Sequence, residues 1–151
     1  MNRLCLALLT LGAITAPKYS AAQALANLEE EKDRVRGTFS MVSGTADGEA
    51  MPAMMAKGMK RVAEGNVTTV TMSGMLYMKA DFSIDPMKSP KTIDYEMTGG
   101  FTAGKKQLGI YRWSGDTVTF CFASPGSARP AEFVSKTGSG VTCTDWKREK
   151  K

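Results

Sequence analysis

The chain has 151 residues, the size of one ordinary domain, so we expect a single hydrophobic core. It contains no histidine, the side chain that most often transfers protons near neutral pH, and we therefore expect a protein that is not an enzyme. The net charge is only +5, and the basic residues are not interleaved with aromatic ones, which argues against nucleic acid as a partner.

The first 22 residues have the order of features that a signal peptidase recognises. Arg3 supplies a positive start, positions 4–16 form an apolar run, and Ser20 and Ala22 are small residues at cleavage-site spacing. The run is too short to span a ~30 Å hydrocarbon core as a helix. We predict cleavage after Ala22, or alternatively after Ala24, and a soluble periplasmic or extracellular protein with no membrane span. An uncleaved N-terminal anchor is the other interpretation.

The residues that follow the signal, 23–36, are predicted to form a short helix ahead of a domain over 37–149. Leu25, Leu28 and Val35 are spaced to share one helical face, and acidic residues precede basic ones, which suits the helix dipole. Gly37 ends the segment.

From Thr38 the apolar period changes to two residues, and turn residues recur about every ten residues. We expect tight turns at Gly65-Asn66, Ser73-Gly74 and Gly115-Asp116. Each strand has one apolar face, so we predict an all-β fold, an antiparallel up-and-down β-barrel of about 8–9 strands. The predicted strands cover residues 38–44, 58–64, 67–73, 76–84, 91–98, 106–113, 117–123, 131–136 and 141–147.

Two cysteines, Cys121 and Cys143, remain after cleavage, and an oxidising compartment would allow them to form a bridge. They lie on predicted strands with a third strand, 131–136, between them. Next-but-one strands are about 9–10 Å apart, beyond the reach of a disulfide. We expect two free, buried thiols, with a disulfide as the alternative. Without histidine or a close cysteine pair, we expect no metal site and no cofactor.

Four strings occur in order along the second half of the chain: residues 85–94 (DPMKSPKTID), residues 108–111 (LGIY) followed by Gly115-Asp116, residues 120–122 (FCF) and residues 129–133 (RPAEF). Together they resemble a lipocalin-like domain family of unknown function that is best known from planctomycete bacteria. The match covers about residues 33–149. The resemblance implies a lipocalin-like β-barrel and export, but no established activity.

The resemblance also implies how one barrel end is closed. Lipocalin-like barrels often begin with a Gly-x-Trp motif, whose tryptophan closes one end beneath a short helix, near a basic residue of the last strand. Here Gly37-Thr38-Phe39 has phenylalanine in that place, and Lys147 or Arg148 is the candidate basic neighbour. We assign Gly37, Phe39 and Arg148 to barrel-end packing.

Patterns that could carry catalysis are weak in this chain. Asp94 and Glu96 share the outward face of one predicted strand, where charged residues are far commoner as solvated side chains than as a glycosidase pair. Residues 136–138 (KTG) match one element of penicillin-recognising serine enzymes, but no Ser-x-x-Lys accompanies them. We therefore name no catalytic residue.

Four methionines, Met51, Met54, Met55 and Met59, lie in one short stretch. Thioethers can bind Cu(I) in an exported protein. A flexible methionine-rich connection over the barrel mouth, acting as a pliable lid, is the interpretation we favour.

Arg129 and Glu132 could together orient an anionic ligand. Equally, Arg129 could tether its own loop to Asp116 or Glu132. We favour this loop-anchoring role for Asp116, Arg129 and Glu132, because a long loop between strands needs its backbone held.

Our leading hypothesis is an exported barrel that binds a small apolar or amphipathic molecule in its interior. The alternative is a non-catalytic protein-interaction or envelope-associated module with a solid core. Less than a few hundred Å³ of enclosed space would rule against the binding hypothesis and put the interaction module first, because ordinary ligand pockets are larger. The predicted lining is Phe82, Ile84, Ile93, Tyr95, Ile110, Val118, Phe120 and Phe122.

Overall fold

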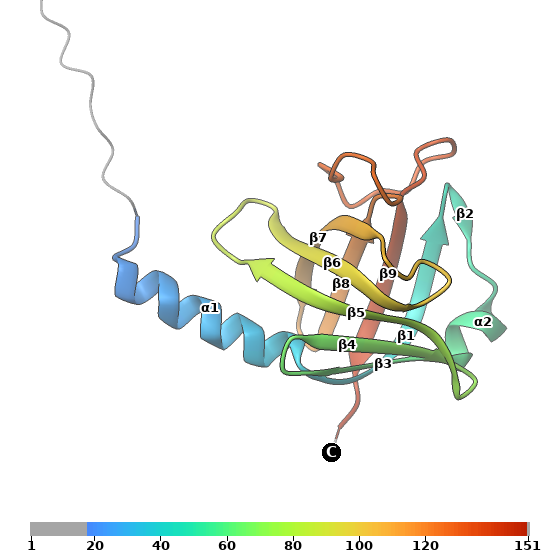
Figure 1. The fold of residues 1–151 in the computed structure, drawn as a ribbon, viewed down its shortest axis with the longest axis horizontal. Helices are drawn as coiled ribbons and strands as arrows, with labels where there is room; N and C mark the ends of the chain where they lie inside the picture. Colours follow the sequence, from blue (N-terminus) through green and yellow to red (C-terminus); the bar gives the residue numbers. More distant parts are fainter. Residues whose placement is uncertain (1–17, 151) are drawn as a thin grey trace, which may run out of the picture.

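A computed structural model of the chain describes residues 18–150 (Figure 1). In chain order, the elements in this range are α1 (Ala21–Val35), β1 (Gly37–Ala46), β2 (Glu49–Ala50), α2 (Ala53–Gly58), β3 (Met59–Glu64), β4 (Val67–Met72), β5 (Met75–Asp85), β6 (Lys91–Gly100), β7 (Lys106–Ser114), β8 (Thr117–Phe122) and β9 (Thr142–Arg148).

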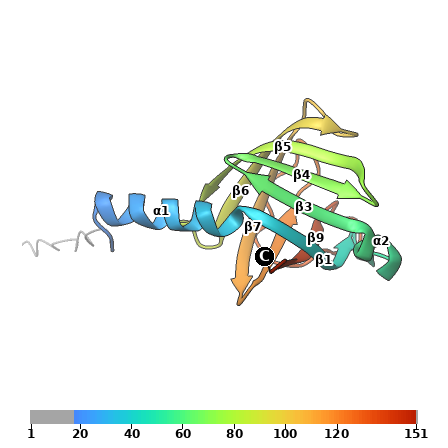
Figure 2. The ribbon, with the colours of Figure 1, turned by 90° about the horizontal axis from the view of Figure 1, so that it is seen from below.

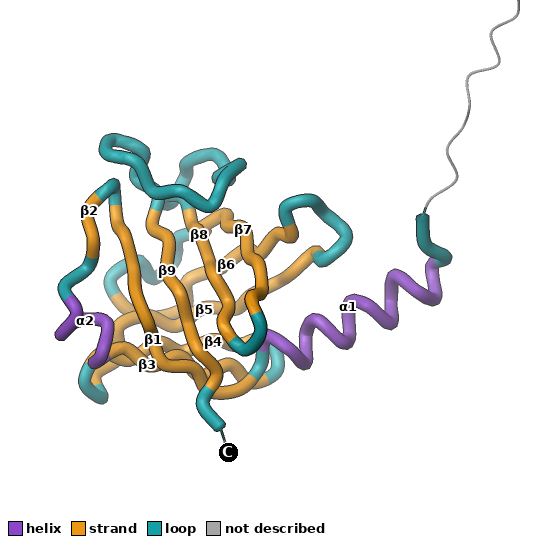
Figure 3. Tube along the Cα trace, turned by 180° about the vertical axis from the view of Figure 1, so that it is seen from behind, coloured by secondary structure: helices purple, strands orange, loops and turns teal. Residues whose placement is uncertain are grey.

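The strands form one antiparallel sheet that closes on itself. Strands β3 to β9 pair in chain order, and β1 pairs with both β3 and β9, which completes a closed barrel of eight strands (Figure 3). The two-residue strand β2 is an extra strand that pairs with β1 outside this ring. Closure leaves no free edge among the eight strands. The predicted up-and-down β-barrel is confirmed.

The predicted turns connect the strands as expected. Ser73 and Gly74, between β4 and β5, both have positive φ angles of 51° and 82°, the conformation that such hairpin turns require. Alternation also holds along the strands. In β6, Ile93, Tyr95 and Met97 are buried between residues that face outward.

The predicted strand at 131–136 is wrong, and this overturns the prediction of free thiols. Residues 123–141 form one long connection without a strand, so β8 and β9 are direct neighbours. Cys121 and Cys143 lie opposite each other in the ladder, with Cα atoms 4.1 Å apart, and form a disulfide. The connection is instead held by side chains: Ser135 Oγ donates to the Val141 carbonyl and accepts from the Gly48 amide.

Helix α1 projects from the barrel, and only its last turns touch it (Figures 1 and 2). Ser20 caps its N-terminus and exchanges hydrogen bonds with Gln23 in a capping box. Glu31 and Val35 are its buried residues, whereas Leu25 is exposed. The helix begins two residues before the predicted start at 23, so cleavage after Ala22 would fall in its first turn. Positions 4–16 of the predicted signal lie outside the described residues.

Candidate functional site

One end of the barrel is closed beneath α1 by Gly37, Phe39 and Arg148, the three residues assigned to barrel-end packing. Phe39 is fully buried, and the Arg148 guanidinium lies 4.6 Å from the centre of its ring. Arg148 also donates hydrogen bonds to the carbonyls of Arg36 and Arg34. Gly37 has a φ of 110°, a conformation that favours glycine, and a Cβ at this position would lie 2.7 Å from Arg148 Nη1 and displace its guanidinium.

A buried carboxylate fastens α1 to the same end. Glu31 accepts hydrogen bonds from Lys91 Nζ at 2.8 Å and from the Tyr111 hydroxyl at 2.9 Å. Burial raises the pKa of Glu31, but these hydrogen bonds and the charges of Lys91 and Arg34 outweigh burial and hold that pKa below its usual value. Burial and Glu31 raise the pKa of Tyr111 far above its usual range, so the hydroxyl remains a donor.

The opposite end is the mouth of the barrel, which α2, the β4–β5 turn and the β6–β7 loop border (Figures 1 and 2). A cavity of about 200 Å³ occupies the interior at this end. Its lining includes Met51 from the connection before α2 and Phe101 from the β6–β7 loop, and Phe101 is 92% exposed. The cavity therefore reaches the surface between these segments.

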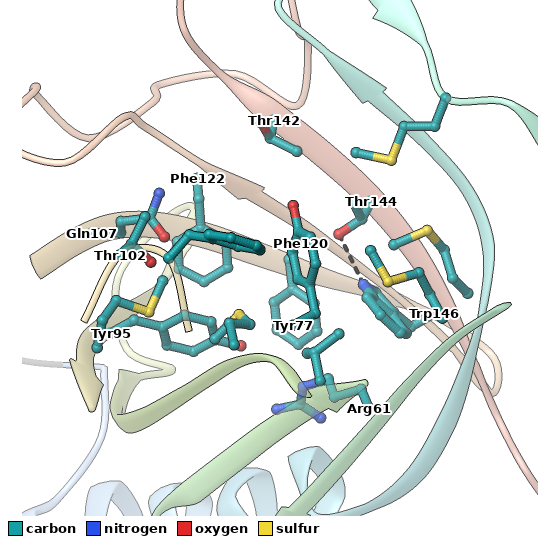
Figure 4. A pocket seen from close by; sticks show the side chains of 17 residues that line it. Arg61, Tyr77, Tyr95, Thr102, Gln107, Phe120, Phe122, Thr142, Thr144 and Trp146 are labelled. Carbon is teal, nitrogen blue, oxygen red and sulfur yellow. Dashed lines mark hydrogen bonds between the residues drawn. The ribbon is translucent and has the colours of Figure 1, made fainter. Parts of the chain in front are cut away.

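The lining is mainly aromatic and thioether (Figure 4). Five methionines and six aromatic residues contribute, together with one valine, three threonines, one glutamine and one arginine. Trp146 donates its indole N–H to Thr144 Oγ1 at 2.8 Å, so this buried polar group is satisfied. The residues are Met41, Met51, Met59, Arg61, Val70, Tyr77, Met78, Tyr95, Met97, Phe101, Thr102, Gln107, Phe120, Phe122, Thr142, Thr144 and Trp146.

The predicted lining residues divide into three groups. Tyr95, Phe120 and Phe122 line the cavity. Phe82, Ile93 and Val118 are buried in the core and Ile84 packs against it, but none of the four borders the cavity.

Ile110 does not line the barrel interior, and its assignment is corrected. Its neighbour Tyr111 belongs to the interior core, so alternation turns Ile110 to the outer face. It lies opposite Cys121 in the ladder and is 1% exposed. In the sequence, an isoleucine that is buried on the outer face of a strand cannot be distinguished from one that is buried in the interior.

Most of the lining was not predicted from the sequence, and Arg61 is the charged residue among those missed. Its side chain is 1% exposed, and its Nη1 donates to the Val35 carbonyl at 2.9 Å. Nε and Nη2 are buried without a hydrogen-bond partner. The available signal was its phase in β3, where Met59, Arg61 and Ala63 alternate with outward Lys60, Val62 and Glu64. Arg61 occupies one of the inward positions of this alternation, but arginine is mostly an exposed residue, so the sequence alone did not indicate that it is buried.

Residues from three of the four strings, Asp94, Gly109 and Arg129, contact one another on the outer face of the barrel. Arg129 Nη1 lies 2.5 Å from Asp94 Oδ1 and donates to the Gly109 carbonyl at 2.7 Å. Gly109 in turn packs against Phe122, and a methyl group at position 109 would lie only 2.5 Å from the ring. Arg129 thus anchors its loop to β6 and β7.

The expected partners of Arg129 are corrected by this geometry. Asp116 stays in the β7–β8 turn, where its carbonyl accepts from the Arg148 amide. Glu132 lies 3.9 Å from Lys136 in an exposed ion pair. With Asp94 bound by Arg129 and Glu96 paired with Lys106 at 2.8 Å, both carboxylates of the outward pair are engaged in ion pairs.

The four clustered methionines have different environments. Met51 and Met59 line the cavity, Met55 packs against the core, and Met54 is 86% exposed on α2. Within residues 18–150, no group of three histidine, cysteine, aspartate or glutamate side chains is placed to hold a metal ion. Likewise, no helix in that range is long and apolar enough to cross a membrane.

A second, more open hollow lies by the C-terminus at the closed end. Its walls carry both signs of charge, from Arg36, Arg148 and Lys150 and from Glu64 and Asp116. Its walls contain no aromatic side chain and several charged ones, so the interior cavity, with its aromatic walls, is the better candidate for a small-molecule site.

Comparison of the chain with protein-family models, curated proteins and solved structures found no match.

Proposed function

We propose that this protein binds a small apolar or amphipathic molecule in the mouth-end cavity of its barrel. The observation that supports the proposal is an interior cavity with aromatic and thioether walls that opens at one end. The other end is filled by Phe39, Arg148 and the last turn of α1. A ligand would therefore enter and leave through the mouth.

The volume of the cavity limits the size of that ligand. About 200 Å³ is below the ~300–1,000 Å³ of ordinary ligand pockets, and volume alone favours a solid barrel. The walls favour binding, because methionines can move aside for a ligand and the buried Arg61 lacks partners for two of its nitrogens. The proposed ligand is accordingly a short chain or single ring.

Export is part of the proposal. The disulfide between Cys121 and Cys143 supports it, because such bonds persist in oxidising compartments. A lipocalin-like relationship is also part of the proposal. It is supported by the resemblance of the four strings between residues 85 and 133 to that family.

The test uses octan-1-ol as a neutral probe and tryptophan fluorescence as the readout, because Trp146, one of the two tryptophans, lines the cavity. We expect a saturable change in emission for the chain from residue 23 onward. Val70→Phe, which fills the cavity from β4, should abolish the change, because Val70 lines it. Val42→Phe is the control, since Val42 is exposed on β1 and should leave binding intact. No saturable binding to the unmodified chain would refute the proposal.

An envelope-associated module is the second candidate, and exposed apolar side chains on three segments of the mouth rim favour it. Met54, Met75 and Phe101 are 86%, 75% and 92% exposed. Such side chains together mark interaction surfaces. The segments that carry them, 51–58, 71–79 and 98–106, contain four lysines and no acidic residue. Apolar tips flanked by lysines suit an anionic lipid surface.

Co-sedimentation with lipid vesicles tests this second candidate. Binding is expected to phosphatidylglycerol-containing vesicles and not to pure phosphatidylcholine. Met75→Asp should weaken it, whereas Met87→Asp should not, because Met87 is exposed on the β5–β6 connection at the closed end. Equal loss in both variants, or no vesicle binding, would refute rim docking without affecting the cavity proposal.

A further inference from the structure

We propose that the ligand of the cavity carries an acidic group and that Arg61 binds this group. The inference rests on the proposed binding function and narrows it to one ligand class, small amphipathic acids. It is carried by the position and the missing partners of one side chain.

Arg61 is charged and buried inside an apolar barrel. Its side chain is 1% exposed, and it forms no ion pair with any carboxylate of residues 18–150. A guanidinium has five N–H groups and stays protonated in proteins. Here Nη1 has the Val35 carbonyl, whereas Nε and Nη2 have no acceptor. A buried charge without a counter-ion is strongly unfavourable unless a partner completes it.

Three aromatic rings surround the guanidinium but do not replace that partner. Its central carbon lies 5.0 Å from the ring centre of Phe120, 5.3 Å from that of Phe39 and 6.0 Å from that of Phe82. Ring faces attract a cation, yet they offer no oxygen to the free N–H groups. The surroundings therefore stabilise the positive charge and leave its hydrogen-bonding capacity unused.

A second unpartnered polar atom lies on the neighbouring strand. Thr68 is fully buried in β4, and its hydroxyl has no hydrogen-bond partner. Arg61 pairs with Val70 and Ala63 with Thr68, so Thr68 lies diagonally across from Arg61 on the same inward face. A carboxylate can accept from the guanidinium fork and from a hydroxyl at once.

The rest of the cavity fits the apolar part of such an acid. Met59 precedes Arg61 by two residues on the same face of β3, and Met78 lies across Val70 on β5. The two free nitrogens of Arg61 are buried, so an acidic group reaches them only when neighbouring side chains move, and the flexible methionines of the lining are the most adaptable of these. The tail then extends past Tyr77 and Phe101, which also line the cavity, toward the mouth.

The test compares octanoate with octan-1-ol at neutral pH, because the two probes share a chain and differ in charge. We expect octanoate to bind the unmodified protein about tenfold more tightly or better, the scale of a hydrogen bond to a charged group. Arg61→Met should abolish this preference, so that the ratio of the two affinities falls to about one. Arg112→Met is the matched control, since Arg112 stacks on Phe133 at the outer face and should keep the preference.

A measurement on the unmodified protein covers the case in which Arg61→Met fails to fold. The NMR signal of the Arg61 Nε–H should shift on adding octanoate and stay in place on adding octan-1-ol at equal occupancy. Binding of octan-1-ol without any preference for octanoate would overturn the acid inference and leave the cavity proposal standing. Binding of neither probe would overturn both.

Discussion

Glu31 and Arg61 are both charged and both buried, but only Glu31 has its full set of partners. Lys91, Tyr111 and Arg34 surround the Glu31 carboxylate, and this cluster ties α1 to the barrel. The contrast separates two uses of a buried charge. Glu31 has the partners of a structural residue, whereas the unpartnered donors of Arg61 support the binding role proposed for it.

Glu31 should make stability depend on pH in the acid range. Its pKa is lower in the folded protein than the ordinary value of 4.5, so its contribution is fully present above about pH 4.5 and is lost as the pH falls through the folded value. We expect Glu31→Gln to be less stable at pH 7 and to lose less stability than the unmodified protein between pH 5 and about pH 3.

Denaturant unfolding at several pH values measures this effect. Glu96→Gln is the control, because Glu96 is 64% exposed in its pair with Lys106 and exposed pairs contribute little. Parallel acid profiles for the unmodified protein and Glu31→Gln would contradict the assigned role.

The close packing at Gly109 in β7 should leave no room for a side chain. A methyl group there would lie 2.5 Å from the Phe122 ring and 3.0 Å from the Cys121 carbonyl. We expect Gly109→Ala to lower the free energy of unfolding by about 1–3 kcal/mol. Gly44→Ala should have a smaller effect, because it meets the flexible end of Met51. Equal effects in thermal unfolding would count against this packing.

Among the elements, those with a strong period could be predicted from the sequence. Eight predicted strands and the helix correspond to observed elements, because alternation and turn residues are local properties. The prediction of a strand at 131–136 was wrong because the conformation of this connection depends on contacts of Arg129 and Ser135 with distant parts of the barrel. A strand at 131–136 would separate β8 from β9, and for that reason the disulfide could not be predicted either.

The disulfide should contribute substantially to stability. It joins residues 22 positions apart, and closing a loop of that length in the unfolded chain is worth about 3 kcal/mol. We expect reduction to lower the unfolding free energy by about this amount in chemical denaturation. Two thiols reacting with an alkylating agent in the unreduced, denatured protein would show that the bond is absent.

Helix α1 should be dispensable in its first half. Its buried residues, Glu31 and Val35, lie in the last turns, and the N-terminal part projects from the barrel. The intact mass and the thermal unfolding of the protein purified from its host test both the proposed cleavage site and the minor role of the first half of α1. We expect a chain that begins at Gln23 and unfolds at the same temperature as one that begins at Lys18. A clear loss of stability on cleavage would contradict the projecting arrangement.

At the scale of the whole molecule, the barrel has two unlike ends. One is sealed by Phe39, Arg148 and α1, and the other is open between α2, the β4–β5 turn and the β6–β7 loop. The sealed end could be anticipated from residues 37–39 and the basic C-terminus. The open end could be only partly anticipated, since three of eight predicted residues line the cavity.

The remainder of the cavity depends on closure of the barrel. Arg61 and Trp146 come from β3 and β9, and both border the cavity because β1 joins those two strands. No local pattern in the sequence indicates that β3 and β9 both pair with β1. The methionines were visible as a group, but their division between cavity, core and surface follows from α2 and β3.

The most direct test of the central claim, that the cavity admits a small apolar molecule, is methyl NMR of the methionines during titration with octan-1-ol. Signals from the five lining methionines, Met41, Met51, Met59, Met78 and Met97, should shift together and saturate, while Met87 at the closed end stays in place. Unchanged signals from the lining methionines at saturating octan-1-ol, or shifts centred on Met87, would contradict the account.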